Sequence, residues 1–263
     1  MIQSSMLACT SLLLIHFTLP YIYFQYAIRN WLNLPWNILI NKQYLPTITV
    51  IIPTYNEELL IKKKLENILN QDYPREKLSI IVVDSSTDNT INKINEFIKE
   101  TKFKVQVIRD TQRRGKIYAM MKGYKLAINS DIIIFTDADS TWKKDALKEA
   151  SKYFSDKSIG VVTGNIYPEY LQKEASLTLE KVYREHTNNL RVSESKYYST
   201  PIVHGPLVAF KKEALMKIGG VRIIPGADDS TLASLTVLSG YRCIQVPSII
   251  IYELSLIHIS EPT

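Results

Sequence analysis

The sequence predicts an α/β fold with a doubly wound, mostly parallel β-sheet. From Pro46 onward, short β-branched runs alternate with amphipathic stretches, which is the rhythm of consecutive β-α units. Two of the runs, Ile80–Val83 and Ile132–Phe135, are apolar at every position, as is typical of parallel strands covered by helices on both faces. Polar clusters follow several runs, and such sheets bind their ligands at the carboxyl ends of the strands.

The first half of this domain has the more regular pattern. Thr54 and Glu57 have the spacing of a capping box, which indicates a helix start. We expect strands at Ile48–Ile52, Ser79–Val83, Lys104–Ile108 and Asp131–Thr136. We expect helices at Glu57–Asn70, Thr90–Lys99 and Lys116–Ile128.

The second half is less regular. Gly219–Gly220 and Gly240 are typical helix stops. We expect helices at Asp145–Phe154, Ala175–Ser195, Lys211–Ile218 and Asp228–Ser239. We expect strands at Gly160–Thr163, Ile202–Phe210, Tyr241–Val246 and Ser248–Tyr252.

The N-terminal segment is different in kind. Met6–Ile28 carries no formal charge, and as a helix it would rise about 1.5 Å per residue, enough to cross a hydrocarbon core of about 30 Å. We therefore expect a single membrane helix over residues 6–28 and a linker to residue 45. Arg29 and Lys42 follow the helix, so the positive-inside rule places the main domain in the cytoplasm. A secretory signal, for which Met1–Ser5 lacks a base, and a buried helix of a soluble domain are the alternatives.

Composition excludes several classes of protein. The 263 residues are 46% hydrophobic and 22% charged, which excludes disordered, collagen-like and multi-span membrane chains. Cys9 and Cys243 cannot form a disulfide framework or a zinc knuckle. The net charge of +6 is scattered, so it suits a nucleotide or an anionic membrane surface without indicating nucleic acid.

Four polar clusters mark the candidate site, and Asp137 with Asp139 is the most specific of them. Two carboxylates at i and i+2 after a strand can bind one divalent cation, and Mg²⁺ commonly combines such carboxylates with substrate phosphates. The alternative is a polar turn in which Asp139 caps the next helix. The clusters are Pro53–Glu57, Asp84–Asp88, Arg113–Lys116 and Asp137–Asp139.

Three further residues each have two interpretations. Asp84 forms a turn, or it accepts hydrogen bonds from a nucleobase or ribose. Glu57 is the partner of Thr54 in the capping box, a function in the site, or both. Lys116 is a solvated surface residue, or it meets phosphate at a helix start beside Gly115.

The second half adds two candidate pairs. Asp228 and Asp229 cap a helix, or one of them is a general base whose pKa the adjacent acid raises. His204, beside Gly205, has a structural function or lines a site for the acceptor.

Taken in order, these motifs resemble a family-2 glycosyltransferase with a GT-A fold. The resemblance covers about residues 46–250 and is strong because the motifs occur in the right order on matching elements. The matching segments are VIIPTYNEE (Val50–Glu58), IIVVDSSTDNT (Ile80–Thr90), RRGKIYAM (Arg113–Met120), FTDADS (Phe135–Ser140), HGPLVAFKKEALMKIGG (His204–Gly220) and GADDS (Gly226–Ser230).

The resemblance implies functions for individual residues. Asp137 and Asp139 would form the D-x-D motif that holds Mg²⁺ or Mn²⁺, chiefly through Asp139. Asp229 would be the catalytic base, although Asp228 stands where the family has Glu, which leaves open which of the two is the base. His204 and Gly205 would lie on the acceptor side. The nucleotide-binding residues would be Pro53, Thr54, Tyr55, Glu57, Asp84, Lys116, Asp137 and Asp139.

The implied reaction is an inverting transfer from a nucleotide sugar to a lipid-linked or saccharide acceptor at the membrane. Residues 46–140 would form the nucleotide-binding half and residues 141–253 the acceptor half. Processive members carry a Gln-x-x-Arg-Trp motif and several membrane helices after this domain. Because residues 254–263 read LSLIHISEPT instead, we expect a truncated or foreign tail.

Two alternative functions stay open at this point. Asp137–Thr141 (DADST) also resembles the motif of haloacid-dehalogenase-like phosphatases, in which Asp137 would be the nucleophile and Asp228–Asp229 would bind metal. That alternative leaves the clusters at 53–57 and 84–88 without a function. The second alternative is an inactive membrane-anchored relative that serves as a partner subunit.

Overall fold

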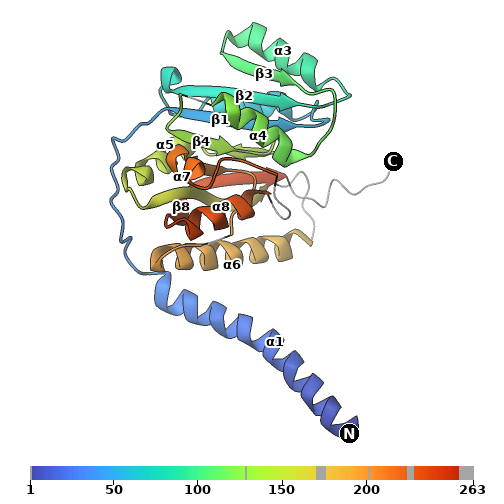
Figure 1. Ribbon diagram of the computed structural model, residues 1–263, viewed down its shortest axis with the longest axis vertical. Helices are drawn as coiled ribbons and strands as arrows, with labels where there is room; N and C mark the ends of the chain where they lie inside the picture. Colours follow the sequence, from blue (N-terminus) through green and yellow to red (C-terminus); the bar gives the residue numbers. More distant parts are fainter. Residues whose placement is uncertain (1, 128, 170–175, 201, 224–227, 255–263) are drawn as a thin grey trace.

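An eight-stranded β-sheet is the centre of the molecule. The computed structural model describes residues 2–127, 129–169, 176–200, 202–223 and 228–254. Helices cover both faces of the sheet, so the predicted α/β fold is confirmed (Figure 1). The strands are β1 (Ile48–Thr54), β2 (Leu78–Asp84), β3 (Val105–Arg109), β4 (Ile132–Phe135), β5 (Ser140–Trp142), β6 (Ile159–Glu169), β7 (Val208–Lys211) and β8 (Arg242–Leu254).

The sheet has a parallel half and a mixed half. Its strand order is β3-β2-β1-β4-β7-β6-β8-β5. The first four strands are parallel, as predicted, and their register pairs Thr54 with Asp84 and Asp84 with Arg109. In the second half, β7 is antiparallel to both β4 and β6, and β5 is antiparallel to β8, while β6 and β8 are parallel. The carboxyl ends of β1, β2 and β4 therefore meet at one edge.

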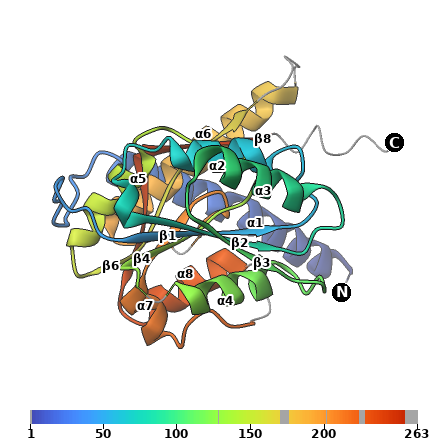
Figure 2. The same cartoon turned by 90° about the horizontal axis from the view of Figure 1, so that it is seen from above.

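Helices pack on both faces because alternate residues of the parallel strands point in opposite directions. Val50 and Ile52 of β1 lie in the core cluster under α2, α3 and α5, whereas Ile51 lies in the cluster under α4, α7 and α8 (Figure 2). Gly123 of α4 is needed here, since a Cβ at this position would collide with the Ile51 side chain. The helices are α1 (Ile2–Trp31), α2 (Ile61–Leu69), α3 (Thr90–Thr101), α4 (Lys116–Leu126), α5 (Ala146–Ser151), α6 (Ser176–Tyr197), α7 (Lys212–Lys217) and α8 (Asp228–Leu238).

The predicted start of the first domain helix is wrong. Helix α2 begins at Ile61 rather than at Glu57. Thr54 is the last residue of β1, and its hydroxyl donates to Asp84 across the sheet. The capping box therefore does not form, because the strand extends through the residue that would have been the cap. Glu57 lies in the turn between β1 and α2, where its carbonyl accepts the backbone N–H groups of Leu60 and Ile61.

Three predicted strands of the second half and the alternative interpretation of Asp139 also differ from the structure. The strand expected over Ile202–Phe210 is only β7, so His204 and Gly205 lie on a loop. The two strands expected after residue 240 are one strand, β8, whose pairing with β6 shifts where Pro247 interrupts it. Asp139 does not cap a helix, because the short strand β5 follows it directly.

The N-terminal helix is longer than predicted and largely outside the domain. Helix α1 leads away from the sheet and meets the domain at α6 (Figure 1). Residues Cys9–Trp31 are long and apolar enough to cross a membrane, and only 6% of the span's most apolar window is buried. The alternative of a buried core helix is therefore wrong. Trp31 stacks on Tyr197 of α6 with a ring-centroid distance of 4.4 Å.

The linker after α1 is bound to the domain. Backbone N–H groups of Leu39 and Asn41 donate to Asp156 and to the Lys152 carbonyl, at 2.7 and 3.2 Å. At the other end, Leu254 completes β8, so one residue of the predicted tail belongs to the sheet. The remaining residues of that tail, 255–263, lie outside the described residues.

Candidate active site

A pocket at the carboxyl edge of the parallel strands collects most of the residues predicted for the nucleotide side. It has a volume of about 220 Å³. It opens between the turn after β1 and the start of α4, as expected for a ligand site of an open α/β sheet. The lining residues are Pro53, Thr54, Tyr55, Glu57, Ser85, Arg113, Gly115, Lys116, Ala119 and Asp137.

One wall of the pocket is formed by Arg113, from the predicted cluster Arg113–Lys116. The guanidinium carbon of Arg113 lies 3.9 Å from the ring centroid of Tyr55. The sequence assigned no separate functions to Arg113 and Arg114. The structure separates them, because Arg114 instead bonds the Tyr118 hydroxyl at 2.6 Å. Arg113 thus offers a cation and a flat face at the pocket.

Asp84 lies beside the pocket and is fully buried. It accepts a hydrogen bond of 2.9 Å from the Thr54 hydroxyl, one from Ser86, and an ion pair from Arg109. Ser86 also approaches through its backbone N–H, which makes the turn that was the alternative interpretation of Asp84. Asp84 therefore holds Thr54, which lines the pocket, and both of its carboxylate oxygens are engaged by the protein itself.

Lys116 joins the two halves of the site. Its Nζ lies 2.7 Å from Asp137 Oδ1 and 3.0 Å from Asp229 Oδ2. Burial alone would lower the pKa of Lys116, but the carboxylates of Asp229 and Asp137 outweigh burial and raise it. Lys116 therefore stays protonated at neutral pH. Gly115, with φ +95, precedes it and lets the chain enter α4 at this position.

The predicted acceptor-side residues divide between two places. A Cβ on Gly205 would lie 2.6 Å from Lys116 Nζ and 3.0 Å from Asp229 Oδ2, and closer still to Asp137, so the lysine and its acids pack directly on the glycine. His204 instead lines a cavity of about 270 Å³ against α6, together with Arg184. Burial lowers the pKa of His204, and the positive charge of Arg184 adds to this effect.

Two further acids make the site strongly negative. Burial, followed by the charges of Asp139 and Asp137, raises the pKa of Glu57 to about 7. Burial and Asp137 also raise the pKa of Asp139, and Lys64 opposes this increase. Among the described residues, the buried Oδ1 of Asp139 has no hydrogen-bond partner. An unsatisfied carboxylate oxygen among other acids fits a divalent cation that prefers oxygen ligands, such as Mg²⁺ or Mn²⁺.

The cation site would be incomplete without a ligand. Within the described part of the chain, no group of three or more His, Cys, Asp and Glu side chains lies close enough to hold a metal by itself. Two carboxylates leave several coordination positions for phosphate oxygens and water. Of the acidic pair in α8, Asp229 reaches the site and is buried. The side chain of Asp228 lies outside the described residues.

Lys64 is a buried residue near the site that sequence reasoning missed. It lies on the inward face of α2 with Ile61, Leu65 and Ile68. Its neighbours Lys62 and Lys63 make the segment resemble a solvated surface. The available signal was the helical spacing, since position 64 falls on the same face as the three apolar residues.

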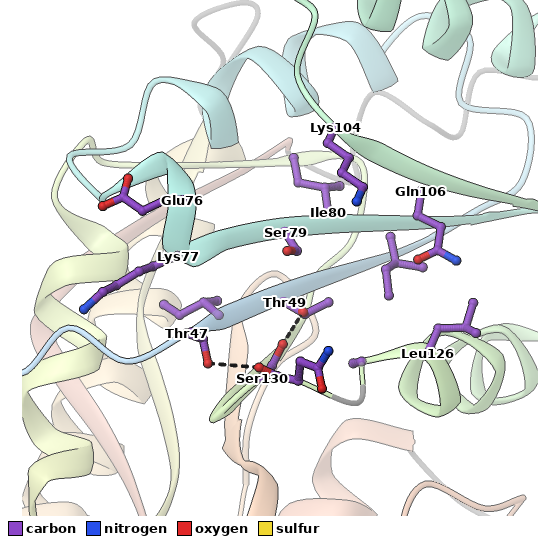
Figure 3. Close-up of a pocket in the computed structure, with 14 residues that line it drawn as sticks. Thr47, Thr49, Glu76, Lys77, Ser79, Ile80, Lys104, Gln106, Leu126 and Ser130 are labelled. Carbon is purple, nitrogen blue, oxygen red and sulfur yellow. Dashed lines mark hydrogen bonds between the residues drawn. The ribbon is translucent and has the colours of Figure 1, made fainter.

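A larger cavity lies at the opposite edge of the sheet. Its volume is about 410 Å³, and Thr47, Thr49, Ser79 and Lys77 line it at the amino-terminal ends of β1 and β2 (Figure 3). The hydroxyls of Thr49 and Ser130 are hydrogen bonded to each other there. None of the predicted site residues lines this cavity, so the candidate chemistry lies at the carboxyl edge.

Comparison with known proteins places this site in a family context. Residues 49–219 match the family described as glycosyl transferase family 2. A mannosyltransferase, PcManGT from Pyrobaculum calidifontis, solved in complex with GDP-Man and Mn²⁺, has a TM-score of 0.81 to this chain. The two are 38% identical, and the match covers 93% of this chain and 67% of that one.

Two curated relatives match over shorter segments. Dolichyl N-acetyl-alpha-D-glucosaminyl phosphate 3-beta-D-2,3-diacetamido-2,3-dideoxy-beta-D-glucuronosyltransferase of Methanococcus voltae is 42% identical over 102 residues, which are 38% of this chain and 32% of that protein. The poly-beta-1,6-N-acetyl-D-glucosamine synthase of Staphylococcus epidermidis is 30% identical over 194 residues, which are 70% of this chain and 45% of that protein. The chain thus spans less than half the length of either protein.

Proposed function

The chain belongs to glycosyltransferase family 2, and we propose that it transfers a sugar from a nucleoside-diphosphate sugar to an acceptor with inversion at the anomeric carbon. One observation carries this proposal: Lys116 links Asp137, which lines the pocket, to Asp229, which lies 92 residues further along the chain. The site thereby combines a place for the leaving diphosphate with a carboxylate that can take a proton.

On the donor side, the proposal assigns the pocket to the nucleotide. Pro53 and Thr54 line it from the end of β1, and Tyr55 and Glu57 line it from the turn that follows. The stacked pair of Tyr55 and Arg113 offers a flat surface to a base or ribose and a cation to phosphate. Asp84 acts in the proposal by holding Thr54 in place.

The proposed cation site is Asp139 with Asp137. The buried, unsatisfied oxygen of Asp139 supports this assignment, and PcManGT was solved with Mn²⁺. When bound, Mg²⁺ or Mn²⁺ would offset negative charge on the leaving diphosphate. Lys116, protonated between its two acids, stabilises the same charge from the protein side.

On the acceptor side, Asp229 is the proposed general base. The acceptor hydroxyl would lose its proton to the Asp229 carboxylate while its oxygen bonds to the anomeric carbon. The bond from that carbon to the diphosphate oxygen breaks on the opposite face. Lys116 Nζ lies 3.0 Å from Asp229 Oδ2, so the contact holds this carboxylate at the junction of the two halves of the site.

We further propose a membrane-delivered acceptor, either a lipid-linked or a growing saccharide. Helix α1 supports this, because its length and exposed apolar surface suit a single membrane crossing. The two curated relatives are named for a dolichyl-phosphate-linked sugar and for a polysaccharide. With Arg29 and Lys42 following the span, the catalytic domain would lie in the cytoplasm.

The family match removes the main support for the phosphatase alternative. The phosphatase alternative would also leave Thr54, Tyr55 and Glu57, which line the pocket, without a function. The remaining alternative is a partner subunit without activity, and an assay must distinguish it from an active enzyme.

The test is release of nucleoside diphosphate from a panel of GDP- and UDP-sugars. The full chain, in detergent with Mn²⁺, would be given polyprenyl phosphate, a lipid-linked saccharide or a free oligosaccharide. We expect one donor to be consumed with one acceptor, and Asp139→Asn to abolish the release. Binding of a nucleotide with Mn²⁺ but consumption of no donor would favour the inactive subunit over the enzyme.

A further inference from the structure

Lys64 carries a buried ammonium group that the proposed mechanism does not use. The residue is 1% exposed, although lysine is among the residues least often buried completely. Among the described residues, no carboxylate oxygen lies within ion-pair distance of its Nζ. Burial lowers the pKa of Lys64 to about 7, against the opposing effect of Asp137 and Asp139. An apolar side chain would pack at this position at lower cost, so the ammonium calls for a functional reason.

The ammonium bonds both ends of the segment that carries the two acids. Nζ donates to the Thr136 hydroxyl at 2.7 Å, immediately before Asp137. It also donates to the carbonyl and the hydroxyl of Ser140, both at 2.9 Å, immediately after Asp139. These bonds use all three of its donors. The Trp142 ring, with its centroid 4.3 Å from Nζ, covers the group.

The same hydroxyls reach the loop that carries Gly205. The Pro206 carbonyl accepts the Thr136 hydroxyl at 2.6 Å, the Ser140 hydroxyl at 3.2 Å and the Trp142 indole N–H at 2.9 Å. An ammonium group can only donate, so each hydroxyl accepts from Lys64 and keeps its own proton for Pro206. Lys64 therefore sets the direction of the whole network.

We propose that Lys64 is a positioning residue, which fixes Asp137 and Asp139 relative to Gly205 so that the two acids can bind a divalent cation. The inference rests on the proposed function, which assigns the cation to these acids. Lys64 touches neither the cation nor the nucleotide, and acts through Thr136, Ser140 and Pro206. Groups that orient metal ligands from behind commonly change metal affinity by about 10- to 100-fold when they are removed.

The experiment compares Lys64→Met with Lys62→Met in the full chain. Lys62 lies in the same helix, but its side chain is exposed and pairs with Glu100. Mn²⁺ binding is titrated by electron paramagnetic resonance with GDP or UDP present, well below the unfolding temperature. We expect Lys64→Met to bind Mn²⁺ about 10- to 100-fold more weakly than wild type, with Lys62→Met unchanged.

Thermal unfolding in EDTA separates positioning from general damage. Methionine removes a buried charge but also removes the donor to the Ser140 carbonyl, and these two effects oppose each other. The midpoint of Lys64→Met should therefore lie near that of wild type while its Mn²⁺ affinity falls. A Mn²⁺ affinity within twofold of wild type overturns the inference and leaves the proposed function intact. If wild type itself binds no Mn²⁺ with either nucleotide, the proposed cation site fails, and this inference fails with it.

Thr136→Val keeps the inference testable should Lys64→Met not fold. It deletes one of the two hydroxyls through which Lys64 reaches Pro206, the one with the shorter bond to the Pro206 carbonyl, and changes little else in shape. Thr141→Val, on the adjoining strand, is the matched control. We expect Thr136→Val to weaken Mn²⁺ binding at least about threefold, on the scale of an outer-shell partner. Equal affinity in the two valine variants overturns the inference.

Discussion

At the scale of single residues, Lys116 decides which acids of this chain work together. It contacts Asp137, at the end of β4, and Asp229, at the start of α8, at 2.7 and 3.0 Å. Gly205 lets all three side chains meet, since any Cβ there would overlap them. The single ammonium group of Lys116 therefore holds two carboxylates together and offsets one of their two negative charges.

The first prediction concerns Asp229. Asp229→Asn keeps a hydrogen bond to Lys116 but cannot accept a proton, so transfer should fall at least about 100-fold. Stabilisation by nucleotide with Mn²⁺ should persist, because the donor side is intact. Initial rates of nucleoside diphosphate release measure the effect, with the exposed Asp72→Asn as control. Unchanged transfer in Asp229→Asn would remove it from the base position.

The second prediction concerns Glu57 and pH. The pKa of Glu57 is about 7 in the folded protein and 4.5 in the unfolded chain, so between pH 4.5 and pH 7 the folded protein binds more protons than the unfolded chain does. The folded protein therefore loses stability as the pH rises through this range. Glu57→Gln removes this loss. From pH 5 to pH 8, the stability of Glu57→Gln relative to wild type should therefore rise by about 1–2 kcal/mol, a figure reduced to allow for partial exposure.

Urea unfolding in EDTA over this pH range measures the difference, since bound metal would change the charge balance around Glu57. The exposed Glu100→Gln serves as control, and its stability should follow that of wild type at every pH. Parallel curves for Glu57→Gln and wild type would show that Glu57 is not buried among acids in solution.

At the scale of elements, helices α1 and α2 show opposite departures from the usual amphipathic pattern. Helix α1 exposes large apolar side chains over much of its length, including Leu13 and Phe17. Helix α2 is rich in lysine, yet it buries Lys64 together with its apolar face. Helix α1 is long and apolar enough to cross a membrane. Lys64 of α2 is instead accommodated by hydrogen bonds to Thr136 and Ser140, on either side of the two acids.

The third prediction concerns α1 and the membrane. Lysine at two apolar positions, Leu13→Lys with Phe17→Lys, should cost about 5–7 kcal/mol of insertion free energy and release the full chain from vesicles. The matched control, Leu59→Lys with Leu238→Lys, replaces two exposed leucines of the domain and should stay bound. Flotation with lipid vesicles measures the bound fraction, and equal flotation of both double variants would argue against a spanning α1.

At the scale of the whole molecule, the strand order brings the site together. Strands β1, β2 and β4 are neighbours in the sheet although β4 follows β3 in the chain, so the segments after residues 54, 84 and 135 converge at one edge. Strand β7 runs antiparallel to β4, and Val208 at its start pairs with Phe135 at the end of β4. The loop that carries Gly205 and enters β7 therefore lies at this same edge of the sheet. The second half of the domain thus reaches the pocket after β1 through the sheet itself.

The fourth prediction belongs to this scale. A nucleotide that binds only the folded chain at 100 times its Kd adds about 2.7 kcal/mol of stability, which for a domain of this size raises the unfolding midpoint by about 5–10 °C. We expect GDP or UDP with Mn²⁺ to produce this shift, and Asp139→Asn to lose most of it. If neither nucleotide moves the midpoint, the donor pocket is wrongly assigned.

The sequence alone predicted the features that depend on near neighbours. The apolar runs of β1, β2 and β4 and the helical period of α3 and α4 are local, so these elements lie within a few residues of their predicted bounds. The acids Asp137 and Asp139 were identified by their spacing after a strand. The adjacent acids Asp228 and Asp229 were identified as a candidate pair, and the family resemblance favoured Asp229 as the base. The apolar N-terminal helix was evident from its lack of charge.

Only the tertiary structure decided which of these residues meet. The Lys116 bridge and the ion pair of Asp84 with Arg109 join segments that are distant in the chain. His204 and Gly205 are adjacent in the chain, but His204 faces a cavity against α6 whereas Gly205 packs against Lys116. Burial of Lys64 depends on its contacts with the loop after β4. Strand β5 has only three residues, which is too short for an alternating apolar pattern to reveal it in the sequence. A local pattern records what a residue prefers next to its neighbours, whereas contacts across a sheet depend on strand order, which no local pattern contains.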